Sequence, residues 1–274
     1  MRQRIEQLLL ENGIAHTAPL SLSACTLTRP YLLERMGITQ GTAFLFVVPY
    51  YTTHCDDPAR NISAYAVSRD YHLFISELFE RILPVLRTEF PAHRFAGFTD
   101  HSPIAEADAA ARAGLGVLGC NHLLLTKEYS SFIFLGEIIT DAMIDAPGIE
   151  PDHCPACGAC LRACPVSGDI AGCRSALTQK KGVLDDEQCA ILQRHGLAWG
   201  CDICQESCPF TVRARERGTL YTTIPFFTEQ AIPRLDVATL TAMTDEELAT
   251  RAFGWRGRAT ILRNLHILEK GENT

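Results

Sequence analysis

Two runs of cysteine in the second half of the chain constrain its fold more than any other feature. The run at 154–165 has four cysteines with gaps of two, two and three residues, and it ends in Cys-Pro. The run at 201–209 has three cysteines with gaps of two and three residues and the same ending. In bacterial ferredoxins, short gaps of this kind let three thiolates surround one cubane, and the cysteine before proline binds a second cluster. The runs therefore predict a segment that folds around metal clusters.

The spacing predicts two [4Fe–4S] clusters with crossed ligation. The first cluster is expected to take three cysteines from the first run and the last cysteine of the second, namely Cys154, Cys157, Cys160 and Cys208. The second is expected to take Cys164, Cys201, Cys204 and one further cysteine. Cys173 and Cys189 are both candidates for that place, and the spacing alone does not choose between them.

Structural zinc is the competing interpretation, because zinc sites also use Cys-x-x-Cys pairs. Two proline-ended runs favour iron–sulfur clusters over zinc. Disulfides are not expected, since nine of the twelve cysteines lie within 154–208 and we identify no export signal. The other three, Cys25, Cys55 and Cys120, are expected to pack as small apolar side chains.

The rest of the chain predicts an α+β protein of more than one domain. With 274 residues, 47% of them hydrophobic, it can bury a sizeable core. Strand-like runs at 42–48, 94–99, 123–126 and 131–140 are interleaved with helical stretches at 61–83 and 102–114, which indicates an α/β or α+β layer. Capping boxes at Asp185–Gln188 and Thr244–Glu247 begin two later helices. We expect domains at 1–150, 151–215 and 216–274: an N-terminal α/β domain, a ferredoxin-like double-cluster domain and a helical segment.

Charge and hydropathy exclude some classes of partner. The net charge of −7 argues against general nucleic-acid binding, which depends on neutralising phosphates. Two arginine clusters remain, and each is either a solvated helix face or a local contact for an anion or RNA: Arg213, Arg215 and Arg217, and Arg251, Arg256, Arg258 and Arg263. No stretch of about 20 apolar residues is present, so we expect a cytoplasmic protein without a membrane partner.

Several motifs, in order along nearly the whole chain, resemble the epoxyqueuosine reductases. The N-terminal part contributes SRDYH at 68–72, DHSP at 100–103 with Glu106, AGLGVLG at 113–119 with Asn121, and SFIFLGE at 131–137. The C-terminal part contributes Cys173-x-Ser175-x-Leu177-Thr178, GCDICQESCP at 200–209, and the segment 253–265. The ferredoxin run is shared by many families, whereas this ordered set is far more specific.

The resemblance implies a function and narrows the ligand set. Members of that family bind cobalamin and two [4Fe–4S] clusters, and they reduce epoxyqueuosine in tRNA to queuosine. Cys173 matches the family's remaining cluster ligand and Cys189 lies outside the pattern. Asp100 matches the family's proton donor, which fits the need of a leaving epoxide oxygen for a proton. The plainer interpretation of Asp100 is a turn residue before a helix that Ser102 caps.

Cobalamin contacts follow from the resemblance alone. The implied residues are Asp100, Gly116, Gly119, Cys120, Asn121 and Ser131. The GxGxxG pattern at 114–119 is not read as a dinucleotide site, because it follows a helix instead of a strand. Cys120 replaces the family's usual lysine and Ala107 its usual arginine. We expect a short form without the helical repeats with which longer members hold tRNA.

Two alternatives remain open. One is a corrinoid iron–sulfur reductase of a small molecule, such as a dehalogenase-like enzyme. The other is a non-catalytic two-cluster electron-transfer protein, which would bind no corrin. The leading interpretation requires a tRNA substrate and a low-potential electron donor such as ferredoxin or flavodoxin.

Overall fold

The computed structural model describes residues 1–272, and these residues form two compact units. Unit 1 comprises Met1–Pro49 and His72–Cys157. Unit 2 comprises Tyr50–Tyr71 and Gly158–Thr274. Each unit is therefore built from two separate stretches of chain. The three-domain division expected from the sequence stays a prediction.

Unit 1 is built on a four-stranded antiparallel sheet with the order β1-β2-β6-β3. Its central strand β2 is buried along its whole length, because both faces of the sheet are covered. The strands are β1 Thr17–Ser21, β2 Thr42–Pro49, β3 Phe95–Phe98 and β6 Ile133–Thr140. A two-stranded hairpin, β4 Val117–Leu118 and β5 Leu124–Leu125, stands beside this sheet.

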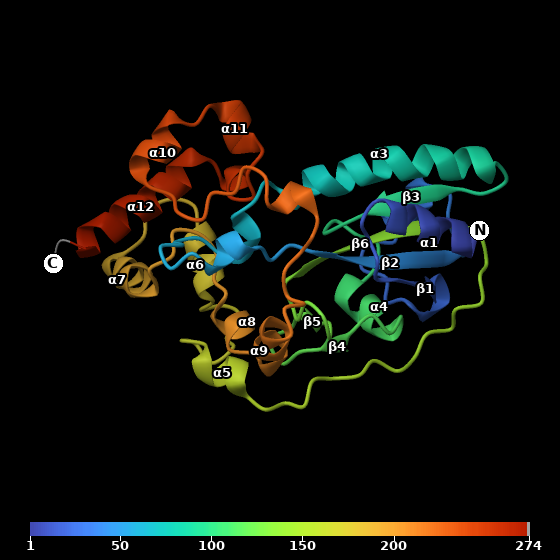
Figure 1. The fold of residues 1–274 in the computed structure, drawn as a ribbon, viewed down its shortest axis with the longest axis horizontal. Helices are drawn as coiled ribbons and strands as arrows, with labels where there is room; N and C mark the ends of the chain where they lie inside the picture. The colour runs from blue at the N-terminus through green and yellow to red at the C-terminus, as the bar shows by residue number, and fades with distance from the viewer. Residues whose placement is uncertain (273–274) are drawn as a thin grey trace. The chain divides into compact units, whose positions relative to one another are not determined.

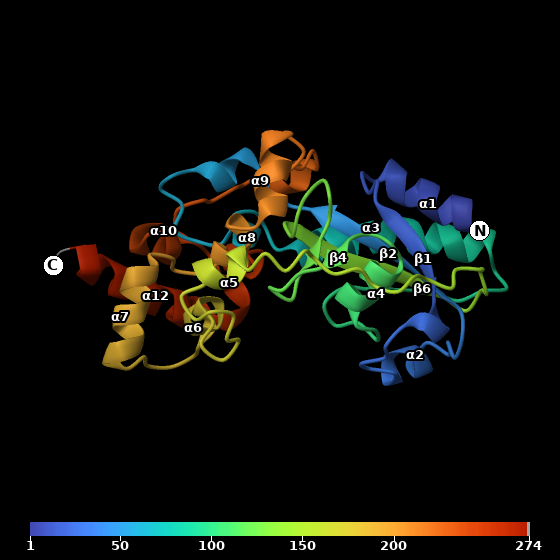
Figure 2. The same ribbon diagram turned by 90° about the horizontal axis from the view of Figure 1, so that it is seen from below.

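Helices cover the two faces of the sheet (Figures 1 and 2). The helix α3 (Tyr71–Glu89) lies on one face, where the Phe79 ring meets Phe46 of β2 edge to face. The alanine-rich helix α4 (Glu106–Arg112) lies on the other, and its buried alanines pack with Leu45 and Ile139. The remaining helices of unit 1 are α1 Arg2–Glu11 and α2 Tyr31–Arg35. The antiparallel pairing confirms the α+β class.

Unit 2 is made of short helices and loops. The C-terminal helix α12 packs against α6, α7 and α10. Asp185 and Thr244 cap α7 and α11 through the two capping boxes that the sequence predicts. The helices are α5 Ala159–Ala163, α6 Arg174–Gln179, α7 Asp186–His195, α8 Ile203–Glu206, α9 Pro209–Glu216, α10 Val237–Ala242, α11 Asp245–Ala249 and α12 Arg258–Glu272.

Two predicted helix starts are wrong. Asn61 does not begin a helix, because its side chain bonds both backbone groups of Leu235, and α3 begins only at Tyr71. Ser102 does not cap α4, which begins at Glu106; its hydroxyl donates to Glu137 instead. The predicted helical stretch 61–83 also ends too early, because α3 continues past Pro84 to Glu89. For Asn61 and Ser102, a residue distant in sequence forms the hydrogen bond that the local pattern assigns to a helix cap.

Asn264 of α12 holds three parts of unit 2 together and gives the first prediction. Its fully buried amide donates to the carbonyls of Thr178 (2.7 Å) and Ala198 (2.8 Å). We expect Asn264→Ala to lower the free energy of unfolding by about 2–4 kcal/mol, because two buried carbonyls lose their donor.

Urea unfolding followed by tryptophan fluorescence would measure this loss, since Trp199 and Trp255 both belong to unit 2. His266→Ala is the matched control, because the His266 side chain is 56% exposed on the same helix. Equal stability of the two variants would contradict the assignment.

Candidate functional site

Asp100 lies on a strained turn directly after strand β3. Its backbone has a φ of +59°, which is unusual for a residue other than glycine. Its N–H donates to Glu106 Oε1 at 3.1 Å. Its side chain is 73% exposed, with Oδ2 at 3.9 Å from Nε2 of His72. The turn therefore exposes the Asp100 carboxyl, while the Asp100 backbone is held by its hydrogen bond to Glu106.

Two carboxyls lie behind this turn, the half-buried one of Glu106 and the fully buried one of Glu137. Glu137 of β6 is fully buried and accepts a hydrogen bond from the Ser102 hydroxyl. Burial is the main cause that raises the pKa of Glu106 to about 7, and the charge of Asp100 adds to it. Burial and the charge of Glu106 raise the pKa of Glu137 well above its usual range. In the sequence, Glu106 and Glu137 belong to separate motifs, and no local spacing predicts this pair.

The glycine segment forms the hairpin β4–β5. Gly114 has a φ of +80° and ends α4, as a helix C-cap does. A Cβ on Gly116 would lie 2.6 Å from the Leu125 carbonyl oxygen, so the hairpin needs glycine there. The Nδ2 of Asn121 is buried and has no hydrogen-bond partner among residues 1–272. Ser131, the other implied cofactor contact, is buried just before β6.

Cys120 lies beside the first predicted cluster ligand. Its N–H donates to the sulfur of Cys154 at 3.4 Å, and the two sulfurs are 3.6 Å apart. Burial opposes ionisation of Cys154, but the N–H groups of Ala156 and Cys120 lower its pKa overall. Bonds from backbone N–H groups stabilise a thiolate, which is the form that binds metal. Cys120, which the sequence predicts as a small apolar side chain and the resemblance as a cobalamin contact, is thus placed beside a predicted cluster ligand.

Four of the predicted ligands lie near one another in unit 2. Burial raises the pKa of Cys204 to about 11, and the neighbouring Cys201, Cys164 and Cys173 contribute to the rise. Burial likewise raises the pKa of Cys201 to about 11, with Cys173 and Cys164 among the contributors. Mutually close thiols resist ionisation until a cation is bound. Cys173 is the upstream cysteine that shares this group.

Cys160, a predicted ligand of the first cluster, also contributes to the raised pKa of Cys204 and so lies near this group, whereas the remaining cysteines are placed separately. Cys154 and Cys157 belong to unit 1, whereas Cys160 and Cys208 belong to unit 2. Cys189 lies in α7, where its thiol contacts the Leu184 carbonyl and lines a separate pocket of about 430 Å³. Within residues 1–272, no group of three or more His, Cys, Asp or Glu side chains is arranged to hold a single metal ion.

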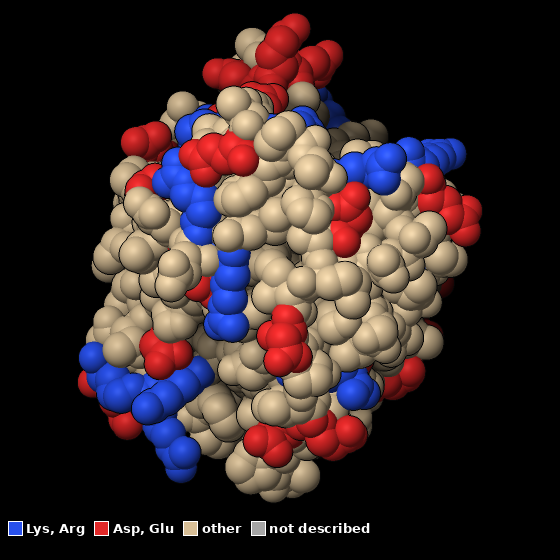
Figure 3. Space-filling model, turned by 90° about the vertical axis from the view of Figure 1, so that its right-hand side faces the viewer, with Lys and Arg blue, Asp and Glu red and all other residues tan. Residues whose placement is uncertain are grey.

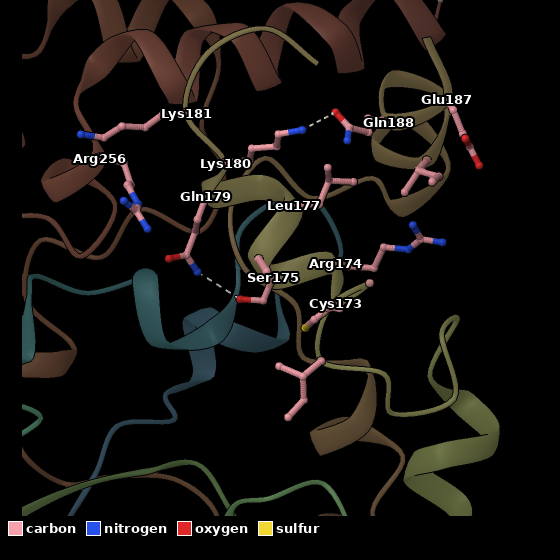
Figure 4. A pocket seen from close by; sticks show the side chains of 15 residues that line it. Cys173, Arg174, Ser175, Leu177, Gln179, Lys180, Lys181, Glu187, Gln188 and Arg256 are labelled. Carbon is pink, nitrogen blue, oxygen red and sulfur yellow. Dashed lines mark hydrogen bonds between the residues drawn. The ribbon is translucent and has the colours of Figure 1, made fainter. Parts of the chain in front are cut away.

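A pocket of about 930 Å³ opens beside Cys173 (Figure 4). Basic side chains dominate its wall, and Glu187 is the acidic one among the lining residues. Polar bonds order one part of it: Gln179 donates to Ser175, and Lys180 donates to Gln188. The basic lining residues are Arg174, Lys180, Lys181 and Arg256.

Most of the C-terminal arginine cluster is structural. Arg251 donates to the Gln230 carbonyl, Arg258 to that of Met243, and Arg263 to those of Lys180 and Gly182. Arg256 differs, since it stacks over the exposed Trp255 ring and lines the pocket at Cys173. The arginines of 251–263 therefore do not form the single patch, a solvated face or an RNA contact, that the sequence suggests.

The surface drawn in Figure 3 carries acidic and basic side chains interspersed, and neither sign dominates it. Among the described residues, no helix is both long and apolar enough to cross a bilayer.

The carboxyl pair predicts a pH dependence of stability. Both pKa values are raised in the folded state, so the pair's contribution is complete below about pH 4.5 and is lost as the pH rises through the folded pKa values. Glu137→Gln removes one of these titrations and keeps an acceptor for Ser102. We expect the variant to gain stability relative to wild type from pH 5 to pH 8, by at most about 1.4 kcal/mol per pH unit.

Thermal or urea unfolding at both pH values measures this difference. Glu77→Gln is the control, because the Glu77 side chain is 53% exposed on α3. A stability difference for Glu137→Gln that is the same at pH 5 and pH 8 would refute the carboxyl-pair account.

Comparison with curated proteins finds relatives that are similar over part of their length. No protein-family model matches the chain. The epoxyqueuosine reductase of Gloeobacter violaceus is 34% identical over 178 residues, which are 61% of this chain and 56% of that protein. That of Pseudomonas aeruginosa is 31% identical over 219 residues, which are 75% of this chain and 59% of that protein. The chain thus spans somewhat more than half the length of the curated relatives it matches.

Solved structures share the fold. An epoxyqueuosine reductase from Streptococcus thermophilus matches with a TM-score of 0.81 and 24% identity, over 100% of this chain and 82% of that one. An epoxyqueuosine reductase with an epoxyqueuosine-modified tRNA-Tyr stem loop matches with a TM-score of 0.77 and 22% identity, over 97% and 80%. One from Bacillus subtilis, with its catalytic aspartate loop swung out of the active site, matches with 0.75 and 22%, over 97% and 80%. The chain is thus a relative of the epoxyqueuosine reductases, as its motifs predict.

Proposed function

We propose that this chain is a cobalamin-dependent iron–sulfur reductase that converts epoxyqueuosine in tRNA to queuosine. The observation that carries the proposal is Asp100, an exposed carboxyl on a strained turn after a sheet strand. The motif resemblance matches this residue to the family's proton donor. The curated relatives are epoxyqueuosine reductases, and one related structure contains an epoxyqueuosine-modified tRNA stem loop; both support this choice of reaction. The proposed compartment is the cytoplasm, and the proposed electron donor is a low-potential ferredoxin or flavodoxin.

The cysteines fit two [4Fe–4S] clusters. Cys164, Cys173, Cys201 and Cys204 form the proposed ligand set of the second cluster, and their mutual proximity in unit 2 supports it. Cys154, Cys157, Cys160 and Cys208 form the proposed set of the first. The thiolate-favouring contacts at Cys154 support its membership. When bound, the clusters supply single electrons to the reaction.

The hairpin segment fits a flat organic cofactor. Gly116 and Gly119 keep their backbone free of side chains, and the buried Asn121 Nδ2 has an unused donor. We assign Asp100, Gly116, Gly119, Cys120, Asn121 and Ser131 as the residues that would hold cobalamin. When bound, the corrin supplies the low-valent cobalt that reduces the substrate.

Asp100 performs the proton step. Reduction of an epoxide to an alkene releases the oxygen as water, so the leaving oxygen must gain protons as electrons arrive. An exposed carboxyl held by Glu106 can donate the first of them. His72, 3.9 Å from Asp100, lies where it can orient the carboxyl. The swung-out aspartate loop of the Bacillus subtilis protein indicates that such a loop can move.

The cluster assignment predicts different outcomes for two cysteines. Cys173→Ala should lose about half of the iron and sulfide after anaerobic reconstitution, because the second cluster lacks a ligand. Cys189→Ala is the matched control and should keep all of it. Iron and sulfide analysis with electron paramagnetic resonance of the reduced protein measures both. If Cys189→Ala loses iron and sulfide while Cys173→Ala keeps its full iron and sulfide content, Cys189 and not Cys173 is the ligand.

The proton-donor role predicts a selective loss of turnover. Asp100→Asn should lower conversion of epoxyqueuosine-containing tRNA by about 10²–10⁴-fold, the usual contribution of a general acid. The absorption of bound cobalamin and clusters should stay unchanged. Mass spectrometry of nucleosides from tRNA of a strain blocked at epoxyqueuosine measures conversion. No conversion by the fully loaded wild type would remove the tRNA assignment, and full turnover by the variant would remove the donor role.

A further inference from the structure

The half-buried carboxyl of Glu106 and the buried carboxyl of Glu137 come from different elements of unit 1 and meet behind the Asp100 turn. Glu106 is the first residue of α4, and Glu137 lies in β6 opposite Phe98 of β3. Because β3 ends at Phe98 and leads directly into the turn, Glu137 lies opposite the last residue of the strand that precedes Asp100. The pair is thus joined to the turn through both the strand and the helix.

Hydrogen bonds connect the pair to the turn at two points. Glu106 Oε1 accepts the N–H of Asp100 at 3.1 Å. Glu137 Oε1 accepts from the Ser102 hydroxyl, whose oxygen accepts the N–H of Ile104 at 3.1 Å. The turn 100–104 is therefore held at its first residue by one carboxyl and at its third by the other.

The surroundings of Glu137 Oε2 indicate that this oxygen carries a proton. Oε2 of Glu137 is buried and has no hydrogen-bond partner among residues 1–272, and the Glu106 carboxyl is its titratable neighbour. A buried carboxylate oxygen without a donor is costly, and two adjacent buried carboxylates cannot both ionise readily. A proton on Glu137 Oε2, directed at Glu106, satisfies both conditions.

The surrounding charges favour ionisation of Glu106 over Glu137. Burial and the Asp100 carboxyl oppose a negative Glu106, whereas the Arg29 guanidinium favours it. Arg29 is fixed nearby through its bond to the Ser102 carbonyl at 3.1 Å. Burial and then the charge of Glu137 raise the pKa of the half-buried Cys25 thiol, and Asp108 adds to this rise while Arg112 opposes it. His72 and His101 are the titratable side chains on the outer side of the turn.

We infer that Glu106 and Glu137 are positioning residues for Asp100 and that they share one proton: ionised Glu106 holds the Asp100 backbone in its left-handed turn, while protonated Glu137 donates to Glu106. The inference rests on the proposed role of Asp100 as proton donor. A bond to an ionised acceptor is stronger than one to a neutral acceptor. Protonation of Glu106 therefore loosens the turn, and the donor is best positioned above the pH at which Glu106 ionises.

The Asp100 amide resonance tests this inference without substrate turnover. In nitrogen-15 NMR spectra of the cluster-loaded protein, we expect this resonance to shift in one step near pH 7, the value to which burial raises the pKa of Glu106. Glu106→Gln should abolish the step. Glu137→Gln should keep it, because the amide replaces the proposed donor, and Glu137→Leu should move it to higher pH, because the donor is lost.

Two controls separate Glu106 from its neighbours. His72→Gln should keep the step, although His72 lies 3.9 Å from Asp100. Asp108→Asn, on the same helix and paired with Arg112 at 3.0 Å, should also keep it. Persistence of the step in Glu106→Gln, or its loss in His72→Gln, would overturn the inference. The amide dispersion in the same spectra shows whether each variant is folded.

A second readout links the pair to catalysis. The rate at which the wild type converts epoxyqueuosine-containing tRNA should decrease as the pH is lowered below 7. The pH–rate profile of Glu106→Gln should not show this decrease, whereas a purely structural role of Glu106 would leave the decrease unchanged. If the NMR step is seen as expected but no tRNA is converted, the proposed function is contradicted and the inference about the carboxyl pair is still supported. A wild-type profile that is flat through pH 7 beside normal conversion would contradict the pair.

Discussion

The carboxylate of Asp202 joins the two stretches of chain from which unit 2 is built. It is 3% exposed, and it accepts hydrogen bonds from Arg60 at 2.6 Å, from the N–H of Ala64 at 2.8 Å and from the Ser63 hydroxyl. Removing such a partner from a buried ion pair typically costs about 3–5 kcal/mol, because the other charge stays buried. Backbone bonds between 61–63 and 198–199 continue the same junction. The second cysteine run begins at the residue before Asp202, so this anchor also fixes where Cys201 and Cys204 lie.

Much of the candidate site follows from local patterns. Cysteine spacing follows from the geometry of a cubane, so it predicts both ligand sets without any tertiary contact, except for the choice between Cys173 and Cys189; the sets stay a prediction. The grouping of Cys173 with Cys164, Cys201 and Cys204 agrees with the choice that the family resemblance makes. The strands at 42–48 and 131–140 were also predictable, because their apolar runs are nearly continuous.

Features that depend on distant partners were not predictable. Asn61 looks like a helix cap until Leu235 takes its side chain, and Ser102 looks like one until Glu137 does. The arginines near the C-terminus read as a surface patch, yet three of them bond backbone carbonyls. The Glu106–Glu137 pair joins a helix start to a mid-strand position, and no local spacing reveals that contact.

The central proposal is that cysteine-bound clusters would supply electrons to a corrin bound by this same chain. The most direct test is the absorption spectrum of the anaerobically reconstituted protein after cobalamin is offered and unbound corrin is removed. The account predicts that the corrin is retained and that its cobalt bands change when the clusters are reduced. Clusters that reduce normally in a protein that retains no corrin would contradict it and would identify an electron-transfer protein instead.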